Sequence, residues 1–535
     1  MPVDLQSSNY DVSPGLFESL RDQFTADAWL YLPEGSLVAT ILVLFLVTLV
    51  VPRRGQKHMA WLALAGLLAT LFTLPSVASH EPTLLFQGMV ASDSFAVYFK
   101  AIFVLATIAV VFLSWLDRGL DGLPMGEYYA LLLTSVLGMF LLASATDILM
   151  LFIGLETVSI PTYILVVYRK HRKDSAEAAL KYVVYGSVSG AVMIYGLSLF
   201  YGFTGSTSLA ALSSLGAVGG VNEAVLVIAG VLVFAGFAYK ISAVPMHFWA
   251  PDIYEGAPTA VTAFLSVGSK AAGFAGLMRL LYAMNMGVGL VDVEQATHHL
   301  DWATILSVVA AVSMTFGNLA AIFQTNVKRM LAYSSIAHAG YILMGVAAIQ
   351  GGYAEAAQAV GYYFLAFLFM NLGAFAVVIL FANRLGSESI DDYRGLGARA
   401  PLAAVSLTIC LLSLVGIPPT GGFVGKLLLF QVAIGAGMYW LAIVAGLNTA
   451  VSVYYYVRIV KNMFLEKGEE GAPALSLPVL GNGVVLVLTA GVILLGTFFA
   501  PAARWVKGVA VEMPERSFPP GVAGASEGSV SSAQE

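Results

Sequence analysis

Nine ionisable residues interrupt the long apolar stretches of this sequence: Lys100, Asp147, Glu156, Lys181, Lys240, His247, Lys270, His338 and Lys426. A charged side chain near the centre of a bilayer costs roughly 2.5–3.5 kcal/mol on insertion scales, so these residues are expected to face the protein interior and to pair. Burial favours the neutral form of a lysine, and a nearby carboxylate favours its charged form. A lysine in such a place can switch between the two forms, so the residues predict proton transfer.

Glu156, Lys240, Lys270 and Lys426 are the strongest candidates, because each lies well inside an apolar run. Glu156 is the natural counter-ion for a lysine. A row of lysines with a histidine between them, joined by water, would pass protons sideways as each ammonium group repels the next. We therefore interpret these four residues as carriers in a relay.

Other members of the set have simpler interpretations. Lys100 lies about a turn inside its helix and is expected to extend its ammonium group to the interface. Asp147 could cap the helix that begins after it. Lys181 follows Glu177 by four residues, the spacing of an ordinary ion pair on one helix face. The polar stretch Tyr185–Gly190 beyond it favours a functional role, and the glycines of that stretch are expected to serve helix packing.

The histidines and one basic pair also have structural interpretations. His247 and His338 could be core histidines with satisfied hydrogen bonds, and His338 is the weaker functional candidate. Lys328 and Arg329 are expected to anchor a helix at the cytoplasmic surface. The sequence alone leaves these alternatives open.

The composition is typical of an integral membrane protein, since 59% of the 535 residues are hydrophobic and only 11% are charged. The apolar residues form about fourteen runs of roughly 17–25 residues, each long enough to cross a bilayer as a helix. The single cysteine, Cys410, excludes an intrachain disulfide and a cysteine-ligated iron–sulfur cluster. No glycine-rich nucleotide-binding loop is present, so redox and nucleotide chemistry are expected on other chains.

Basic residues gather in four loops, which the positive-inside rule assigns to the cytoplasmic side: Pro52–Lys57, Tyr168–Lys173, Asn326–Arg329 and Arg458–Glu470. The loop Val291–Asp301, expected on the other side, is acidic. No cleavable signal peptide is evident at the start of the sequence. We therefore expect a multi-pass protein of the bacterial cell (inner) membrane with both termini on the extracytoplasmic side.

The expected fold is an all-α polytopic membrane protein of about 14 transmembrane helices, of which the seventh and the twelfth are broken. Lys240 precedes Pro245 in helix seven, and Lys426 follows Pro418 and Pro419 in helix twelve. Two interrupted helices in corresponding positions predict two inverted five-helix repeats. The predicted segments are an extracytoplasmic stretch (1–35), helices 1–3 (36–126), a first repeat of helices 4–8 (127–285), a second repeat of helices 9–13 (299–465), helix 14 (478–500) and a loosely ordered tail (501–535).

Two stretches resemble motifs of a known family, the antiporter-like membrane subunits of respiratory complex I, which are similar to subunits of multi-subunit cation/proton antiporters. Gly154–Tyr163 resembles the family's glutamate motif, and Lys240–Thr259 resembles its broken helix. The resemblance covers nearly the whole chain. It is closest to the N-type branch, because Asp252–Thr259 follows the break, Lys426 stands where the M-type branch has glutamate, and the long lateral helix of the L-type branch is missing.

The resemblance implies a role for each residue of the row. The implied roles are an ion pair that gates the inlet half (Glu156 with Lys240) and its neighbour (Lys181), a central connection (His247 and Lys270) and a terminal carrier towards the outer face (Lys426). The loop Asp391–Gly397 also resembles a family loop and is expected to shape a surface. The stretch before about residue 36 and the tail after about residue 501 match no motif.

The implied function is proton translocation within an NADH:quinone oxidoreductase, driven by quinone reduction elsewhere in the complex. The chain would act as a subunit of that enzyme without a redox centre of its own. No cofactor or metal is expected on this chain, and NADH, FMN, iron–sulfur clusters and quinone are expected on other subunits. The expected partners are an antiporter-like M-type subunit, small subunits of the K, J, A and H types, the peripheral redox arm and the lipid bilayer, with no nucleic acid.

Two other functions stay open. A cation/proton exchange subunit of a multi-subunit antiporter would work without redox coupling and without flavin or iron–sulfur partners. A structural scaffold would need the buried charges only to hold helices together. In that case, neutralising them would lower assembly and leave the turnover of each assembled complex intact.

Overall fold

The computed structural model describes residues 21, 27–216, 223–285, 301–353, 355–468 and 473–508. Most of the predicted N-terminal stretch, the acidic loop apart from its last residue, and the tail beyond residue 508 lie outside the described residues. The first part of the predicted tail forms the helix α20 (Phe499–Lys507), which buries Val506 and packs the Trp505 ring 4.8 Å from that of Tyr98. The expectation of a loosely ordered chain is wrong for this part, because its apolar side chains find a surface to pack on.

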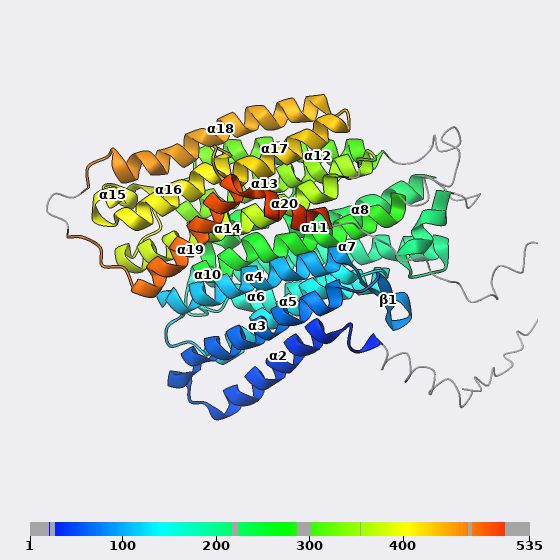
Figure 1. The fold of residues 1–535 in the computed structure, drawn as a ribbon, viewed down its shortest axis with the longest axis horizontal. Coiled ribbons are helices and arrows are strands. Elements are labelled where there is room, and N and C mark those ends of the chain that lie inside the picture. The colour runs from blue at the N-terminus through cyan, green and yellow to red at the C-terminus, as the bar shows by residue number, and fades with distance from the viewer. Residues whose placement is uncertain are drawn as a thin grey trace, which may run out of the picture.

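The described chain is a bundle of long helices with one small hairpin (Figure 1). Thirteen helical segments of the described residues are long and apolar enough to cross a membrane. The shorter pair α16 and α17 corresponds to the predicted broken helix twelve, which brings the total to the fourteen spans predicted. The helices are α2 (Leu32–Val50), α3 (Met59–Ala78), α4 (Ser94–Leu116), α5 (Met125–Ser144), α6 (Ile148–Val166), α7 (Lys173–Thr204), α8 (Glu223–Ile241), α9 (Trp249–Gly256), α10 (Thr259–Phe264), α11 (Lys270–Asn285), α12 (Trp302–Ile322), α13 (Val327–Gln350), α14 (Ala356–Leu385), α15 (Leu396–Arg399), α16 (Pro401–Val415), α17 (Gly421–Gly435), α18 (Tyr439–Phe464), α19 (Val479–Thr497) and α20. A π-helical turn, Leu265–Ser269, joins α10 to α11. The strands β1 (Thr83–Leu85) and β2 (Val90–Ser92) pair antiparallel.

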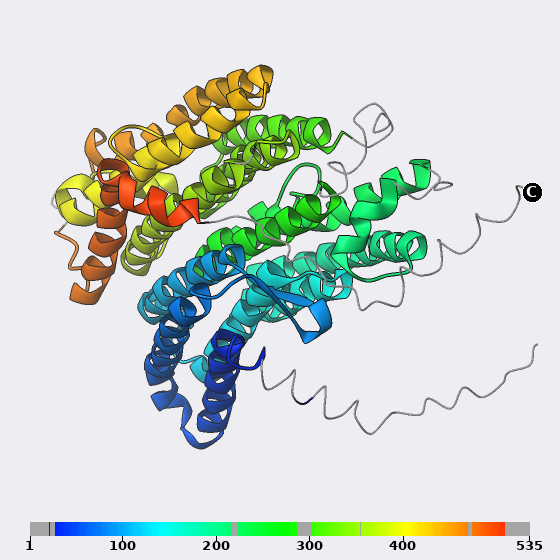
Figure 2. The same cartoon turned by 45° about the vertical axis from the view of Figure 1, so that its right-hand side comes forward.

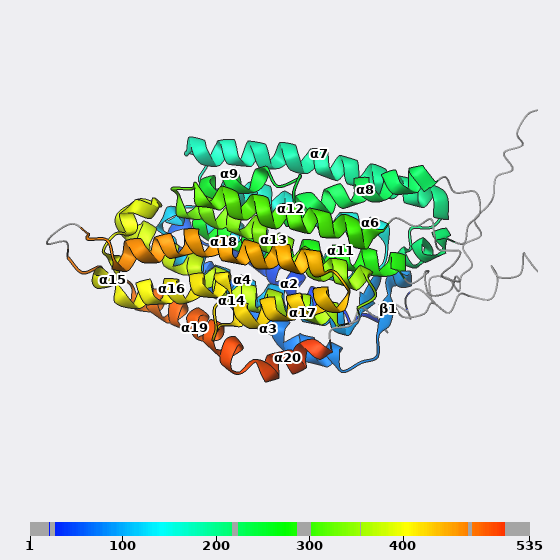
Figure 3. The same cartoon turned by 90° about the horizontal axis from the view of Figure 1, so that it is seen from above.

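The centre of the bundle is formed by α10, α11, α13 and α14. These helices are almost entirely buried. Figure 2 shows the blue N-terminal helices and the orange C-terminal helices at opposite ends of the molecule, with the green central helices between them. Figure 3 shows α7 along one edge and α20 along the other. The central helices carry Lys270 and His338, so the middle of the predicted row lies in the best protected part of the protein.

Both predicted helix breaks are present, and a serine hydroxyl binds a backbone N–H group beside each one. After α8, the N–H of Val244 donates to Ser313 Oγ at 3.0 Å. After α16, the N–H of Gly422 donates to Ser413 Oγ at 3.1 Å. Proline removes a donor and clashes with the preceding turn, and the membrane interior does not satisfy backbone groups that are left open. The serines therefore stabilise the exposed backbone next to each break.

Two lysines that were expected at membrane surfaces are instead buried in ion pairs. Lys100 Nζ lies 2.6 Å from Glu34 Oε1, and both side chains are almost completely inaccessible. Lys328 Nζ lies 2.9 Å from Glu388 Oε1 and is fully buried. The predictions of an interfacial Lys100 and of a surface anchor at Lys328 are therefore wrong, because each ammonium group faces a carboxylate that is distant in the sequence.

A further buried ion pair ties three helices together near the small hairpin. Arg279 of α11 binds Asp93 through two nitrogens, with Nη1 2.5 Å from Oδ2 and Nη2 2.6 Å from Oδ1. Asp93 also caps α4 by accepting the N–H of Ala96 at 2.8 Å, and Arg279 Nε donates to the carbonyl of Ala143 at 2.8 Å. The pair is shielded from solvent and is fully hydrogen-bonded, so it fixes α4, α5 and α11 relative to one another.

Removing one partner of this pair should destabilise the chain strongly. Asp93→Ala leaves a buried guanidinium group without a counter-ion, which costs about 3–5 kcal/mol. We expect much less of this variant in membranes and a lower melting temperature in detergent. The control is Asp121→Ala, which breaks an exposed pair with Lys57 and should cost at most about 1 kcal/mol. Equal effects of the two substitutions would contradict the structural role of Asp93.

Candidate proton-transfer site

Lys240 lies at the end of α8, directly before the break, and its side chain is buried. Its Nζ donates a hydrogen bond to Ser159 Oγ at 2.9 Å. Ser159 follows Glu156 by three residues on α6, so the two side chains are neighbours on one helix face. Glu156 interacts electrostatically with Lys240, although no direct ion pair joins them in the described structure. The two charges of the predicted gating pair thus share one site, where a serine hydroxyl binds the ammonium group.

Two glycines of α7 leave room for the polar groups of this site. A Cβ at Gly190 would lie 2.9 Å from Glu156 Oε1, and one at Gly186 would clash with the hydroxyl of Tyr163. The expectation that these glycines serve close packing is confirmed. They do so next to an ionisable carboxylate, so α7 and α6 approach each other where the charge of Glu156 lies.

Lys181 lies near the start of α7, away from Glu156. Its Nζ is 2.8 Å from Glu177 Oε1 and 2.7 Å from Asp252 Oδ2. Nine residues separate Lys181 from Gly190, which faces Glu156, and this corresponds to about 13 Å along a helix. The pair with Glu177 is confirmed, and Asp252 links Lys181 to the broken helix. The structure does not bring Lys181 next to Glu156.

His247 lies in the non-helical segment between α8 and α9 and is buried. Its ring packs against those of Phe248 and Phe316, with centroids 4.4 and 4.5 Å apart. In the part of the chain that the structure describes, no hydrogen bond joins His247 to Lys270. Its role in a central connection stays a prediction.

Lys270 joins the two halves of the bundle. Its Nζ donates to Ser335 Oγ at 2.6 Å and to the Ser335 carbonyl at 3.1 Å, both on α13. The hydroxyl of Tyr254 lies 3.3 Å from the same Oγ. About one turn along α11, a Cβ at Gly273 would lie 3.0 Å from Lys240 Cγ. α11 therefore packs against the stem of Lys240 and directs Lys270 towards α13.

His338 of α13 is enclosed by hydroxyl groups and cations. Its Nδ1 lies 2.5 Å from the Tyr363 hydroxyl, and its Nε2 lies 3.3 Å from the Tyr456 hydroxyl. Lys426 and Lys270 both interact with it electrostatically. An imidazole with a tyrosine hydroxyl at each ring nitrogen is placed to exchange protons on both sides. The geometry thus makes His338 a stronger candidate for proton transfer than the sequence did.

Lys426 lies at the second break and ends the row. Its Nζ donates to the carbonyl of Val415 at 2.8 Å and lies 4.4 Å from the centre of the Tyr341 ring. Ser335, His338 and Tyr341 follow one another at three-residue spacing, so each neighbours the next on the surface of α13. α13 therefore presents a series of polar groups from Lys270 to Lys426.

The remaining candidate, Asp147, caps a helix. Its Oδ1 accepts the N–H of Leu149 at 2.8 Å at the start of α6, which confirms one of its two interpretations. Among the described residues, no group of three or more His, Cys, Asp or Glu side chains is arranged to hold a metal ion. The groups that the row does contain are amines, an imidazole, a carboxylate and hydroxyls, and these exchange protons.

Sequence reasoning missed the hydroxyl groups that connect the row, which are Ser159, Ser335, Tyr363 and Tyr456. Serine and tyrosine are too common in membrane helices for their presence alone to be informative. One signal was available, because Ser335 stands three residues before His338 in a largely apolar run. Asp252 belongs to the stretch Asp252–Thr259 that follows the first break, but its contact with Lys181 depends on the direction that the chain takes after that break.

All ionisable residues of the row lie within a segment that matches a known protein family. The family described as "NADH:quinone oxidoreductase/Mrp antiporter, TM" matches residues 145–452, more than half of the chain. This chain belongs to that family. The matched segment begins before Glu156 and ends after Lys426, so it contains every ionisable residue of the row. The resemblance inferred from the sequence is confirmed.

Members of the family from several bacteria are similar over most of the chain. The NADH-quinone oxidoreductase subunit N of Chlorobium chlorochromatii is 44% identical over 500 residues, which are 92% of this chain and 96% of the relative. The subunit N of an Anaeromyxobacter species is 44% identical over 512 residues, with 92% and 98% covered. These names agree with the N-type branch that the sequence indicated.

Two chains of solved structures have the same fold. A chain of the respiratory complex I from Thermus thermophilus with bound aureothin is 32% identical, with a TM-score of 0.72 over 88% of this chain and 98% of its own. A chain of the Mrp complex from a Dietzia species is 20% identical, with a TM-score of 0.73 over 89% and 97%. At that identity, the second comparison shows the fold alone.

Adding a methyl group beside Glu156 should impair the site. Gly190→Ala brings a Cβ to 2.9 Å from Glu156 Oε1, which is the far end of a flexible side chain, so the carboxylate can shift at little cost in stability. We expect the carboxylate to move and the rate of proton transfer to fall in membranes that contain the variant. Gly202→Ala is a matched control, because it lies on the same helix with no atom within 4 Å of the added Cβ. Normal rates in both variants would contradict this account.

Proposed function

We propose that this chain carries protons across the membrane as a subunit of an NADH:quinone oxidoreductase. The observation that supports the proposal is the row of ionisable and hydroxyl groups from Glu156 to Lys426, in which Glu156 is partly exposed and the lysines Lys240, Lys270 and Lys426 are buried. A membrane protein that needs only to pack has no use for amines so far from water. The relatives that cover nearly the whole chain are named as subunits of this oxidoreductase.

The row suggests how protons move. Glu156 and Lys240 form the inlet half, Lys270 and His338 connect the two breaks, and Lys426 releases protons towards the outer face. Moving one charge against about 100 mV costs about 2.3 kcal/mol. A change of that size follows from gaining or losing a hydrogen bond to a buried charge, which contributes roughly 1.5–3 kcal/mol. Small movements at Ser159 or Ser335 are therefore sufficient to drive a step.

The proposed setting is a multi-subunit complex in the bacterial cell (inner) membrane, with both termini extracytoplasmic. An M-type subunit, small K-, J-, A- and H-type subunits and a peripheral redox arm are the proposed neighbours. NADH, FMN, iron–sulfur clusters and quinone would be bound by those other chains. The single cysteine, Cys410, which is buried, supports this division of labour, because iron–sulfur clusters need several cysteine ligands.

A cation/proton exchange subunit is the second candidate, because the description of the matching family also names the Mrp antiporter. The two candidates differ in their partners. Purification of the native assembly should yield flavin- and iron–sulfur-containing subunits under the first proposal. Recovery of an assembly without any redox subunit would favour the second.

Neutralising Lys240 or Glu156 should slow proton translocation. In the assembled complex, we expect Lys240→Ala and Glu156→Gln each to slow proton translocation roughly tenfold or more, which corresponds to about 1.4 kcal/mol. The measurement is proton uptake per electron in membrane vesicles, with Lys57→Ala as a surface control. If both variants translocate protons at the normal rate and with the normal number of protons per electron, the proposal is wrong. If each variant yields less assembled complex but the complex turns over normally, a structural scaffold is favoured.

The structure also predicts a role for His338 in the middle of the row. His338→Phe keeps a planar aromatic ring of somewhat larger size and removes both contacts with tyrosine hydroxyls. We expect proton translocation to slow by at least about tenfold, and by roughly 10²–10⁴-fold if proton transfer at this histidine limits the rate. Thr489→Val removes a hydroxyl buried outside the row and should leave translocation unchanged. If His338→Phe pumps as well as this control, the histidine is only structural.

A further inference from the structure

The end of the short helix α9 is bound by side chains from three other elements. The carbonyl of Gly256 accepts hydrogen bonds from Ser175 Oγ at 2.6 Å and from Arg169 Nη2 at 3.1 Å. The carbonyl of Ala257 accepts from the same Nη2 at 3.0 Å and from Lys328 Nζ at 3.0 Å. Positive side chains are favourable at a helix C-terminus, where carbonyls lack partners within the helix. These donors therefore hold the end of α9 in place.

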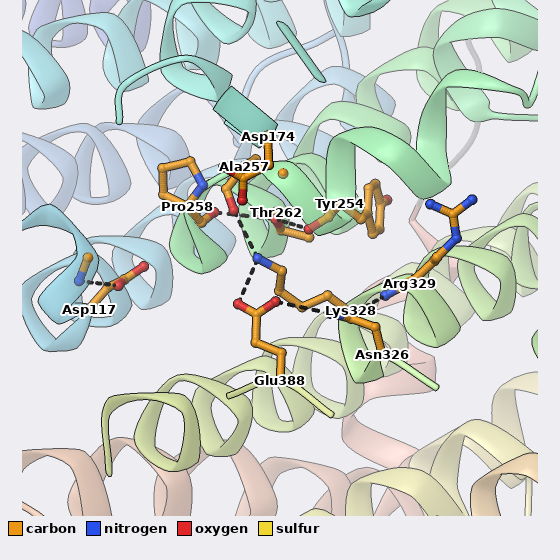
Figure 4. Close-up of polar contacts among 12 residues, drawn as sticks. Asp117, Asp174, Tyr254, Ala257, Pro258, Thr262, Asn326, Lys328, Arg329 and Glu388 are labelled. Atoms are coloured by element: carbon orange, nitrogen blue, oxygen red, sulfur yellow. Dashed lines mark hydrogen bonds and ion pairs between the residues drawn. The ribbon is translucent and has the colours of Figure 1, made fainter. Parts of the chain in front are cut away.

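Lys328 is the buried member of this group. Figure 4 shows its ammonium group between the carbonyl of Ala257 and the carboxylate of Glu388, which lies 2.9 Å away. Glu388 also accepts from Asn326 Nδ2 at 3.4 Å, and its carbonyl accepts the N–H of Val327 at 2.9 Å. A buried ammonium group is expensive unless it is paired. The arrangement gives Lys328 a counter-ion and directs it to a single backbone carbonyl.

The contact between Lys328 and Ala257 bears on the position of Lys270. The segment from Ala257 to Lys270 contains α10 and the π-helical turn, and it is held against α13 at both ends. Lys328 binds its beginning, and Ser335 binds its end through two hydrogen bonds to Lys270. Seven residues separate Lys328 from Ser335, which is about 10.5 Å along the helix. α13 is thus a common support that sets where Lys270 lies.

Neighbouring contacts strengthen this junction on its other side. The N–H of Ala260 donates to Asp117 Oδ2 at 3.3 Å, so the first turn of α10 is also bound. Asp117, Arg169 and Glu388 line a polar cleft of about 470 Å³. Glu388 is partly exposed there, whereas Lys328 is not. The ion pair thus connects a surface cleft to the interior segment that carries Lys270.

We propose that Lys328 is a positioning residue for the proton relay: held by Glu388, it fixes the α9–α10 junction against α13 and so keeps Lys270 on Ser335. The inference rests on the proposed function, since it assigns Lys328 an effect on a relay residue that it does not touch. Lys328 itself does not carry protons in this scheme. Lys328 contributes by setting the distance between Lys270 and its hydrogen-bond partner Ser335.

The test uses the complete complex in native membranes. Lys328→Met removes the charge and keeps most of the volume, and Lys328→Arg keeps a cationic donor. We expect Lys328→Met to slow proton translocation roughly tenfold to a hundredfold, the range that a misplacement of about 1 Å produces. Lys328→Arg should recover most of it. Hydrogen exchange of residues 257–270 should be faster in Lys328→Met and near normal in Lys328→Arg.

Two reference variants make the outcome decisive. Lys461→Met removes an exposed lysine that pairs with Glu466 and should behave as the unmodified chain. Lys270→Ala tests the relay itself: normal pumping in that variant would refute the proposed function. If Lys270→Ala is impaired and Lys328→Met pumps normally with normal hydrogen exchange, only the present inference is overturned.

A variant that fails to assemble still leaves a test. The double variant Lys328→Met, Glu388→Gln removes both charges of the pair and avoids an unpaired carboxylate, so it should assemble better than Lys328→Met alone. Slow pumping with rapid exchange of residues 257–270 in the assembled double variant supports the inference. Normal pumping in the double variant overturns it.

Discussion

A charge buried in hydrocarbon needs a partner, and this requirement governs most of the structure. Four lysines inside the described bundle illustrate it: Lys100 binds a carboxylate, Lys240 and Lys270 bind serines, and Lys426 binds a backbone carbonyl. The partners differ in kind. A carboxylate keeps an ammonium group charged, whereas a serine or a carbonyl can also bind the neutral amine. Lys240, Lys270 and Lys426 donate to partners of the second kind, which can bind both protonation states.

The same requirement applies to the backbone. A proline break frees backbone groups in a region without bulk water. Near both breaks, a serine hydroxyl accepts a freed N–H group, and near the second one Lys426 binds a freed carbonyl. Each helix end also carries a partial charge, because its last backbone groups lack partners within the helix. The breaks therefore do more than interrupt helices, since they place polar backbone atoms beside the proposed relay residues Lys240 and Lys426.

α13 is the element on which the two halves depend. It holds Lys328 and Ser335 against the segment that leads to Lys270, and it places His338 and Tyr341 on the way to Lys426. Because one helix carries all of these groups, a displacement of its start would also move the groups near its end. This gives a physical route by which an event at the first break can alter the second, without a contact between Lys240 and Lys426.

The sequence by itself determined the membrane-spanning α class, the broken helices and most members of the row, because hydropathy and proline act locally. Glu156, Lys240, Lys270 and Lys426 stood out since a charge in an apolar run is rare whatever its surroundings. Only the tertiary structure decided which group each one meets. Lys100 and Lys328 looked like surface residues, yet they pair with Glu34 and Glu388. Lys181 belongs with Asp252, and His338 lies between two tyrosines. Such pairings join residues that are far apart in the chain, and local patterns carry no information about them.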